Sequence, residues 1–350
     1  MRFLLTDEQS DFARALRGLL GSSDVPAAVR AWSRGDHAPG RAVWGRLADA
    51  GLFALGAHEA YGGVGPEPLP VELAVAFVEL GRAGVPGPVV ETVAASVLLG
   101  RLGDEGVGDE GVAKRFLPGL VAGEAMATLA LPGGGPYVLD ADAAAYCFVV
   151  SEAGELRLGG GGGGVRASTD PARRLSVAAG VGGGDVLAAG PAVTAAAEAA
   201  CCWARLLTAA QCLGVGEALL ARTVEYAKRR TQFGAPIGSF QAVKHRLADT
   251  LLALEFARPL LWAAALSLDP GDVAAAKLTA GEAAYAAAMT ALQFHGAVGY
   301  TEELDLSLWL RKARPLRDAW GTPAACRSAV LRAASHAPSR APSRLRGRPR

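Results

Sequence analysis

The 350-residue sequence predicts a mainly α-helical fold with a small β domain. Three observations predict it: apolar residues recur at helical spacing over the first third, short apolar segments separated by glycine fill the middle, and long helical patterns return in the last part. The expected organisation is an N-terminal helical domain over residues 1–124, an antiparallel sheet domain over 125–193, a helical bundle over 194–335 and a tail over 336–350.

The first domain is predicted from a helix start signal and from apolar helical patterns. Residues 6–9 read TDEQ, which is a capping-box pattern, so a helix is expected to begin near Asp7. Further helices are expected over residues 42–56, 70–84 and 88–102, which are rich in alanine, leucine and valine.

The middle domain is predicted from short strand-like segments, such as residues 146–150 (YCFVV) and 155–158 (ELRL). Six consecutive glycines, Gly159–Gly164, follow the second of these segments. No GK[ST] sequence comes after them and no helix begins there, which argues against a phosphate-binding loop. We expect a hairpin turn or a flexible insert at this place.

The last domain is predicted from four helical segments, at residues 194–229, 237–267, 271–294 and after Pro323. Long helices joined by short loops predict an antiparallel four-helix bundle. The remaining residues, 336–350, are rich in proline, serine and arginine and cannot bury a core, so we expect a disordered basic tail.

Composition excludes several classes of function. A hydrophobic share of 51% with 20% charged residues is typical of a globular protein, and a net charge of +1 provides no overall field that would attract nucleic acid or anionic lipid. The five cysteines are odd in number and form no CxxC pair, which suits buried thiols in a reducing compartment. The first residues have no signal-peptide pattern, and no charge-free apolar run reaches about 18 residues. We therefore expect a cytoplasmic protein without a membrane span and with a small-molecule partner.

Two segments of the last domain carry a resemblance to a known family. Residues 230–249 read RTQFGAPIGSFQAVKHRLAD and closely resemble the acyl-CoA dehydrogenase pattern RxQFGxPIxxFQxxxHxLAD. Residues 293–301 read QFHGAVGYT, beside the family's QxxGGxGYT. Shorter similarities lie at residues 59–65 and 117–124. The likeness spans residues 1 to about 335 and is strongest from 204 to 322.

The chemistry of these segments agrees with the resemblance. An arginine just after a helix can grip a diphosphate with its planar guanidinium, and small residues let backbone N–H groups approach a phosphate. In the family, the two segments hold the ADP half of an FAD whose ring lies mostly in a neighbouring subunit. The resemblance therefore implies an oligomer, an acyl-CoA substrate and an FAD shared across a subunit interface, with these cofactor-binding residues: Arg230, Gln232, Phe233, Gln293, Gly296 and Ala297.

The glutamate that serves as the family's catalytic base is missing from this sequence. The reaction removes a proton next to a thioester while a hydride leaves for the flavin, so it needs a positioned carboxylate. In most members that carboxylate follows an RxAR segment in a YEGT string, and here residues 311–314 (RKAR) lead to 319–322 (AWGT), which places Trp320 at the glutamate position. Some members carry the base 26 residues before the first residue of RxQFG, and that position is Ala204. The resemblance therefore assigns no catalytic residue to this chain.

The segment that meets the flavin ring also departs from the family. The family's TEPxxGSD string aligns with residues 132–136, which read PGGGP and carry no hydroxyl. Segments that would serve a neighbour's flavin are thus retained, whereas segments that would serve the chain's own chemistry are lost.

This pattern of loss favours a non-catalytic partner in a heteromeric acyl-CoA dehydrogenase. The chain resembles one subunit of the actinobacterial enzymes built from two different chains, some of which act on steroid side chains. The leading hypothesis is a heterotetramer in which this chain completes the FAD site of a glutamate-bearing acyl-CoA dehydrogenase homologue.

Two alternatives remain open. An autonomous flavoenzyme, such as an oxygen-using relative, would need no base at these positions, with Asp318, Glu302 or Glu303 assisting. A non-enzymatic protein for assembly or acyl-CoA binding would keep the fold without FAD.

No metal centre is expected. His245 and His295 lie in the family segments but have no partners with metal-ligand spacing, and Cys201 and Cys202 are adjacent on a predicted helix and face different sides of it.

Overall fold

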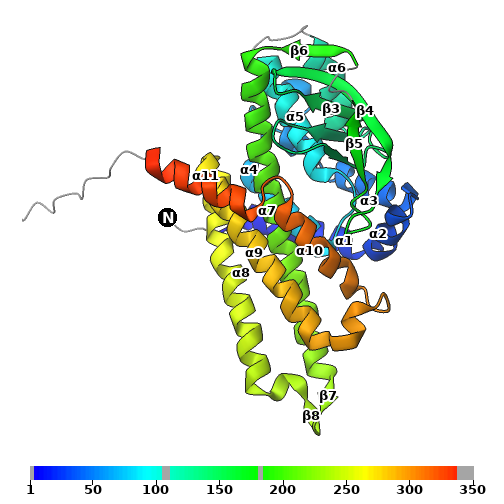
Figure 1. Ribbon diagram of the computed structural model, residues 1–350, viewed down its shortest axis with the longest axis vertical. Helices are drawn as coiled ribbons and strands as arrows, with labels where there is room; N and C mark the ends of the chain where they lie inside the picture. The colour runs from blue at the N-terminus through cyan, green and yellow to red at the C-terminus, as the bar shows by residue number, and fades with distance from the viewer. Residues whose placement is uncertain (1–3, 105–110, 180–183, 337–350) are drawn as a thin grey trace, which may run out of the picture.

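The N-terminal part of the chain is helical, as predicted (Figure 1). The computed structural model describes residues 4–104, 111–179 and 184–336. The predicted capping box is confirmed, because the Gln9 amide donates to the Thr6 hydroxyl at 3.2 Å and the Gln9 side chain accepts from the Thr6 amide at 3.0 Å. The elements are α1 (Asp7–Gly21), α2 (Val25–Ser33), α3 (Ala38–Asp49), η1 (Phe53–Gly56), η2 (Glu59–Tyr61), α4 (Pro70–Ala83), α5 (Val89–Asp104) and α6 (Gly111–Val121).

A six-stranded sheet follows, and it differs from the prediction in two respects. Its strands are β1 (Ala127–Ala130), β2 (Tyr137–Leu139), β3 (Tyr146–Val150), β4 (Glu155–Arg166), β5 (Leu175–Ala179) and β6 (Val186–Ala189). The order is β1-β3-β4-β5-β2, and β6 pairs with β4. The expectation of an antiparallel sheet is wrong for one pair, because β1 and β3 run parallel: the chain returns across the sheet through β2 before it enters β3.

The predicted turn or insert at Gly159–Gly164 is also wrong. These glycines lie inside β4, where Gly160 and Gly162 pair with Ala179 and Val177 of β5. Backbone hydrogen bonds hold a strand together even where no side chain is present to pack. The register shifts between Gly162 and Arg166, which is typical of glycine in a strand.

The C-terminal part is a bundle of long helices (Figure 1). Its elements are α7 (Pro191–Arg229), β7 (Thr231–Gln232), β8 (Ala235–Pro236), η3 (Ile237–Ser239), α8 (Gln241–Ser267), α9 (Pro270–His295), η4 (Gly296–Tyr300), α10 (Leu306–Asp318) and α11 (Pro323–His336). The mainly α-helical fold with a small sheet is confirmed. The expected tail from residue 337 on lies outside the described residues.

Helix α7 is the central helix of the molecule, and it begins beside the sheet and ends at the β7–β8 hairpin at the far tip of the bundle (Figure 1). It approaches α4 so closely that only glycine fits at the crossing. A Cβ on Gly81 would lie 2.2 Å from the carbonyl oxygen of Gln211, and a Cβ on Gly214 would lie 1.9 Å from that of Val78. The crossing fixes the N-terminal domain against the bundle.

Two helices, α7 and α8, are long and apolar enough to cross a membrane by length and composition alone. The most apolar window of α7 is 78% buried inside the protein, and core helices of soluble proteins pass the same test. The corresponding window of α8 is 39% buried, because one face of this helix is exposed.

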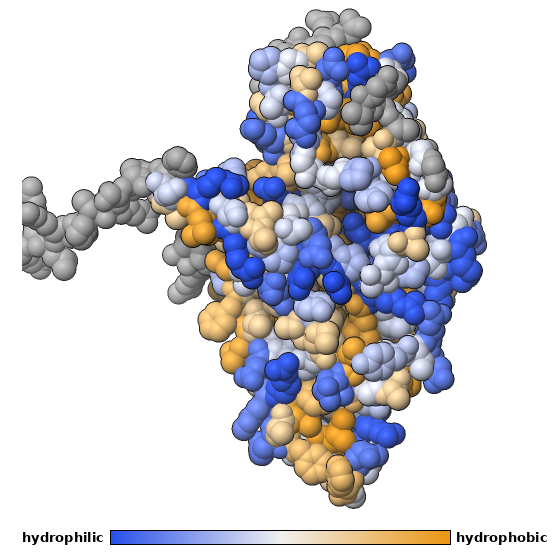
Figure 2. Space-filling view, in the orientation of Figure 1, coloured by the Kyte–Doolittle hydropathy of each residue, from blue (hydrophilic) through white to orange (hydrophobic). Residues whose placement is uncertain are grey.

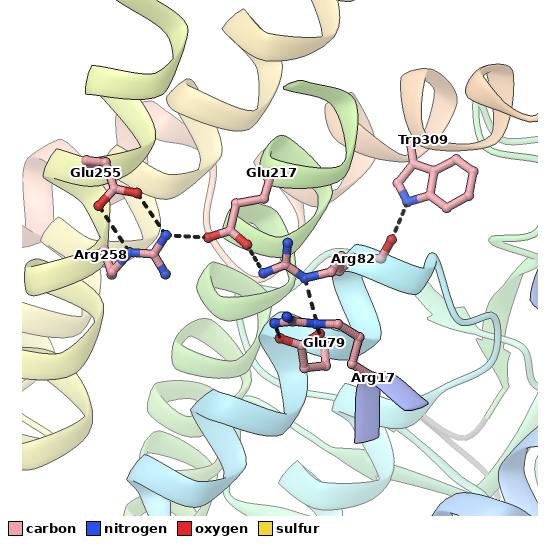
Figure 3. Close-up of polar contacts among 7 residues, drawn as sticks. All are labelled: Arg17, Glu79, Arg82, Glu217, Glu255, Arg258 and Trp309. Atoms are coloured by element: carbon pink, nitrogen blue, oxygen red, sulfur yellow. Dashed lines mark hydrogen bonds and ion pairs between the residues drawn. The ribbon is translucent and has the colours of Figure 1, made fainter. Parts of the chain in front are cut away.

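An ion-pair network joins the N-terminal helices to the bundle (Figure 3). The carboxylate of Glu79 on α4 accepts from Arg17 on α1 and from Arg82 one turn later. Arg82 also pairs with Glu217 on α7, and Glu217 accepts from Arg258 on α8 at 2.7 Å. One connected set of charges therefore holds four helices.

Candidate functional site

The β7–β8 hairpin presents the first group of predicted cofactor-binding residues. Gln232 pairs with Ala235, so Phe233 and Gly234 form a two-residue turn in which both φ angles are positive, at 55° and 77°. Such turns match the twist of a hairpin but are unfavourable for an aromatic residue. The Phe233 side chain is 93% exposed. A strained, exposed aromatic residue at a hairpin tip is suited to contact with another molecule.

Arg230 lies at the base of this hairpin, as the C-cap residue of α7. Its backbone amide donates to Tyr226 at 2.8 Å, and its carbonyl accepts from Ile237 at 2.8 Å. Among the described residues, its side chain has neither an ion-pair nor a hydrogen-bond partner. The guanidinium is thus free to bind an anion outside this chain.

The loop after α9 presents the second predicted group. Gly296 ends the helix with φ 60° and ψ −137°, and a Cβ at this position would meet nothing within 4 Å. Gln293 and Ala297 are exposed on either side of it. The loop therefore leaves open space in front of its backbone, as a phosphate-binding segment requires.

The two groups are fixed relative to each other by a stacked pair of rings. Tyr226 near the end of α7 and His295 at the end of α9 have ring centroids 4.1 Å apart. His295 Nδ1 lies 2.8 Å from the carbonyl of Ala291, and burial lowers the pKa of this imidazole. A neutral His295 that donates through Nδ1 explains both contacts, so this histidine has a structural role.

A pocket lies along the N-terminal half of α7, away from the hairpin. We call it the Trp320 pocket; it has a volume of about 390 Å³ and lies between α5, the β1–β2 connection, the start of α7 and the α10–α11 turn. Its lining includes both Arg205 and the family's glutamate position, Trp320. Arg205 and Arg230 are separated by 25 residues of helix, or roughly 38 Å at 1.5 Å per residue. One dinucleotide does not span that distance, so the segments around Arg230 cannot serve this pocket.

Hydrogen bonds hold Trp320 and the turn around it in the pocket wall. Its indole Nε1 donates to Glu91 Oε1 at 3.1 Å, and its carbonyl accepts from Arg205 Nε at 2.8 Å. The buried Lys277 ammonium donates to the carbonyls of Arg317 and Gly321, at 2.7 and 3.4 Å. Trp320 itself has φ 57°, a left-handed conformation that is unfavourable for a bulky residue. The residue at the family's glutamate position is therefore hydrogen-bonded through both its side chain and its backbone.

Glu91 is the pocket residue that sequence reasoning missed. It lies in the first turn of α5, and its side chain is almost completely buried. Burial raises the pKa of this carboxyl, although Arg173, its own backbone amide and Trp320 oppose the rise. The carboxyl is therefore neutral over a wider pH range than an ordinary glutamate. A signal was present in the sequence: Glu91 stands in the apolar run Val89–Leu99, where an acidic residue must face a polar partner.

A small cavity of about 20 Å³ lies behind Glu91 and has room for about one water molecule. It is lined in part by Glu91, Arg173 and Asp140. Asp140 accepts from Trp32 Nε1 at 3.0 Å, and its Oδ2 has no partner among the described residues. Burial raises the pKa of Asp140 to about 7. Two carboxyls of raised pKa thus adjoin one arginine.

The alternative carboxylates named from the sequence are only partly brought to the pocket. Asp318 lines it and pairs with Arg317 at 3.3 Å. Glu302 is an exposed residue that pairs with Arg311, and Glu303 is exposed, so neither lines the pocket. Ala204 is fully buried within α7. No family base position therefore carries an acid.

The residues present fit the ADP half of an FAD at the hairpin end, where an unpaired arginine and an open glycine loop meet. They do not fit a flavin ring in the Trp320 pocket. The Gly133 amide donates to Glu152 at 3.2 Å and the Gly134 amide to Leu131 at 3.0 Å, so these N–H groups are already used within the chain. No group of three possible metal ligands occurs within the described parts of the chain.

Comparison with known proteins identifies the family. Family models for the N-terminal and C-terminal domains of acyl-CoA dehydrogenases match residues 6–124 and 194–335. The acyl-CoA dehydrogenase IpdE2 of Mycobacterium tuberculosis is 32% identical over 308 residues, which cover 88% of this chain and 91% of that protein.

Solved structures share the fold. The ChsE4–ChsE5 complex from Mycobacterium tuberculosis contains a chain that is 25% identical, with a TM-score of 0.79, covering 97% of this chain and 100% of that chain. PigA, solved with FAD and proline, matches with a TM-score of 0.82 at 22% identity, covering 96% and 99%. On the combined ground of both domain matches and a relative aligned over nearly its whole length, this chain belongs to the acyl-CoA dehydrogenase family.

Proposed function

We propose that this chain is the non-catalytic subunit of a heteromeric acyl-CoA dehydrogenase, in which it completes the FAD site of a glutamate-bearing partner. The residues assigned to that FAD are Arg230, Gln232, Phe233, Gln293, Gly296 and Ala297. FAD in the partner would supply hydride acceptance, and the partner would supply the base. This chain binds and orients the ADP half.

The observation that carries the proposal is the contrast between the two halves of α7. At the N-terminal half, Ala204 and Trp320 leave both base positions without a carboxylate. At the C-terminal end, Arg230 is exposed and unpaired among the described residues, and Phe233 is 93% exposed. An unpaired cation and an exposed aromatic ring on an ordered hairpin are stabilised by a ligand from a neighbouring subunit.

A second observation supports a partner subunit. Helix α8 exposes large apolar side chains on its outer face: Leu251, Leu252, Phe256, Leu260 and Leu266. Figure 2 shows hydrophobic residues over this helix and at the tip of the bundle near β7–β8. The hairpin leads through η3 directly into α8, so one partner covering both would also reach Arg230. We assign this face to a subunit interface rather than to a lipid bilayer.

Relatives support the same assignment. The ChsE4–ChsE5 structure is a complex of two different proteins, and a second structural neighbour is the Tcur3481–Tcur3483 steroid acyl-CoA dehydrogenase. A cytoplasmic location is part of the proposal, and the five free cysteines agree with it.

The test is co-expression with a glutamate-bearing homologue, with bound flavin measured from its visible absorbance. We expect flavin in the mixed complex and none with this chain alone. Arg230→Ala should weaken flavin binding by about tenfold or more, because it removes charge-assisted hydrogen bonds to a phosphate. Arg14→Ala, at an exposed arginine of α1, is the matched control. A mixed complex without flavin would refute the proposal, and full activity of Arg230→Ala would favour an assembly role.

One observation favours a second candidate, an autonomous flavoenzyme of altered chemistry. Glu91 and Asp318 bring two carboxyl groups to the Trp320 pocket. Stoichiometric flavin in this chain purified alone would support that candidate and would exclude a subunit that depends on its partner for the cofactor.

A further inference from the structure

The Trp320 pocket contains two guanidinium groups without a carboxylate partner. Arg173 and Arg205 both line it, and neither forms an ion pair with any described residue. Arg205 uses only Nε, which donates to the Trp320 carbonyl at 2.8 Å. Arg173 has no side-chain hydrogen bond to a described residue. A partly buried cation without a counter-charge is costly, so the pocket favours an anion.

The acidic groups nearby form no ion pair with either arginine within the described parts of the chain. Glu91 and Asp140 adjoin Arg173 at the small cavity but form no ion pair with it among the described residues, and burial raises the pKa of both carboxyls. Asp318 also lines the pocket, but Arg317 pairs with it at 3.3 Å. One oxygen of the Glu91 carboxyl accepts from Trp320, and burial favours the protonated form of this acid.

Much of the remaining wall is apolar and firmly held. It includes Leu129, Leu131, Leu139 and Leu175 together with the ring of Trp320. The clamp of Arg205 and Lys277 on the α10–α11 turn keeps Trp320 in its unfavourable backbone conformation. Strain that is maintained by buried donors is a sign of a built site. A volume of about 390 Å³ is within the range of small-molecule pockets.

We propose that the Trp320 pocket binds a short aliphatic carboxylate, with Arg173 and Arg205 holding the carboxylate and the leucines and Trp320 enclosing the chain. The ligand replaces the flavin ring that this pocket does not fit. The two arginines bind its oxygens by charge-assisted hydrogen bonds, for which a guanidinium has the matching geometry. Glu91 contributes a further hydrogen bond. The site is independent of the FAD site at the C-terminal end of α7.

The test is a titration of the full chain, alone and in complex with its partner, with pentanoate and with its uncharged analogue pentanamide. Tryptophan fluorescence reports binding because the Trp320 ring forms part of the wall. Loss of the fluorescence change in Trp320→Phe shows that the change comes from Trp320. Sodium chloride at equal ionic strength is the control for a general effect of anions. We expect pentanoate to bind at least about tenfold more tightly than pentanamide, which corresponds to about 1.4 kcal/mol.

Three variants make the test specific, with melting curves used to confirm that each one folds. Arg173→Met should weaken pentanoate binding by about tenfold or more, whereas Arg101→Met, at an exposed arginine on α5, should leave it unchanged. Glu91→Gln should change the affinity by less than about threefold, since an amide has the size of the protonated carboxyl that burial favours.

Three outcomes would overturn the proposal. They are equal binding of acid and amide, equal effects of Arg173→Met and Arg101→Met, and a gain of about tenfold or more in Glu91→Gln, which would mean that an ionised Glu91 already neutralises the arginines. None of these outcomes affects flavin binding at Arg230, so the failure of this proposal is distinguishable from failure of the proposed function.

Discussion

Substitution of Glu79 by glutamine tests the network that joins the N-terminal helices to the bundle (Figure 3). The Glu79 side chain is 4% exposed, and its oxygens accept from Arg17 at 3.0 and 2.7 Å and from Arg82 at 3.1 Å. Glutamine keeps the shape but removes the charge and replaces one acceptor by a donor. Two arginines then face an amide.

The magnitude follows from how well each arginine can find another partner. Breaking a buried ion pair costs about 3–5 kcal/mol. Arg17 is 57% exposed and can turn to water, and Arg82 keeps Glu217 as a partner, so the loss should lie at the lower end, about 3 kcal/mol. Glu255→Gln is the matched control, because Glu255 sits at the exposed end of the same network, where an ion pair is worth about 0.2–1 kcal/mol.

The assay is equilibrium unfolding in urea, followed by circular dichroism and by tryptophan fluorescence. We expect the Glu79→Gln midpoint to fall well below that of Glu255→Gln, with the same slope. Equal midpoints for the two variants would refute the reasoning, because burial would then add nothing to the strength of the network.

Three further predictions concern a buried acid, a buried base and the exposed face of α8. Burial raises the pKa of Asp140 to about 7 from an ordinary value of 3.8, so the folded state retains a proton that the unfolded state loses. The free energy of unfolding should therefore fall by about 4 kcal/mol between about pH 4 and pH 7. In Asp140→Asn, urea midpoints measured across this pH range should fall much less. The same pH dependence in this variant as in the wild type would contradict the prediction. Lys277→Met removes the donors to the carbonyls of Arg317 and Gly321 and should lower the free energy of unfolding by about 1–3 kcal/mol. Proteolysis at the α10–α11 turn should become faster. A proteolysis rate equal to that of the wild type would show that Lys277 does not hold this turn. Phe256→Asp places a charge on a 70% exposed ring and should dissociate the oligomer in sedimentation experiments without lowering the melting temperature of the chain; an intact oligomer would exclude this face as the interface.

Much of the fold was predictable because helical periodicity and caps are local signals. The helix at Asp7 follows directly from its capping box. The expected helix over residues 42–56 is instead split into α3 and η1, because Gly51 adopts φ 77° and ends the helical path. The glycine run is a strand because β5 lies beside it, and no local property of glycine indicates such a neighbour.

The candidate site was predictable only where a motif marks it. Arg230 and Gly296 stand in long family strings, and the structure leaves both open to a ligand. Glu91 belongs to no such string, and its role depends on Trp320, which lies 229 positions away in the sequence. Contacts of this kind depend on the packing of α5 against α7 and on the turn after α10, so a single sequence does not reveal them.

The length of α7 has a consequence for how such proteins diverge. Helix α7 places the β7–β8 hairpin at its C-terminal end and the Trp320 pocket along its N-terminal half. Substitutions at one of these sites are too distant to share contacts with the other, and their effects are expected to add independently. After gene duplication, one copy can lose its own reaction centre while still supporting its sister's cofactor. With this architecture, two copies can come to have different roles when one of them loses only the catalytic residues of its own pocket.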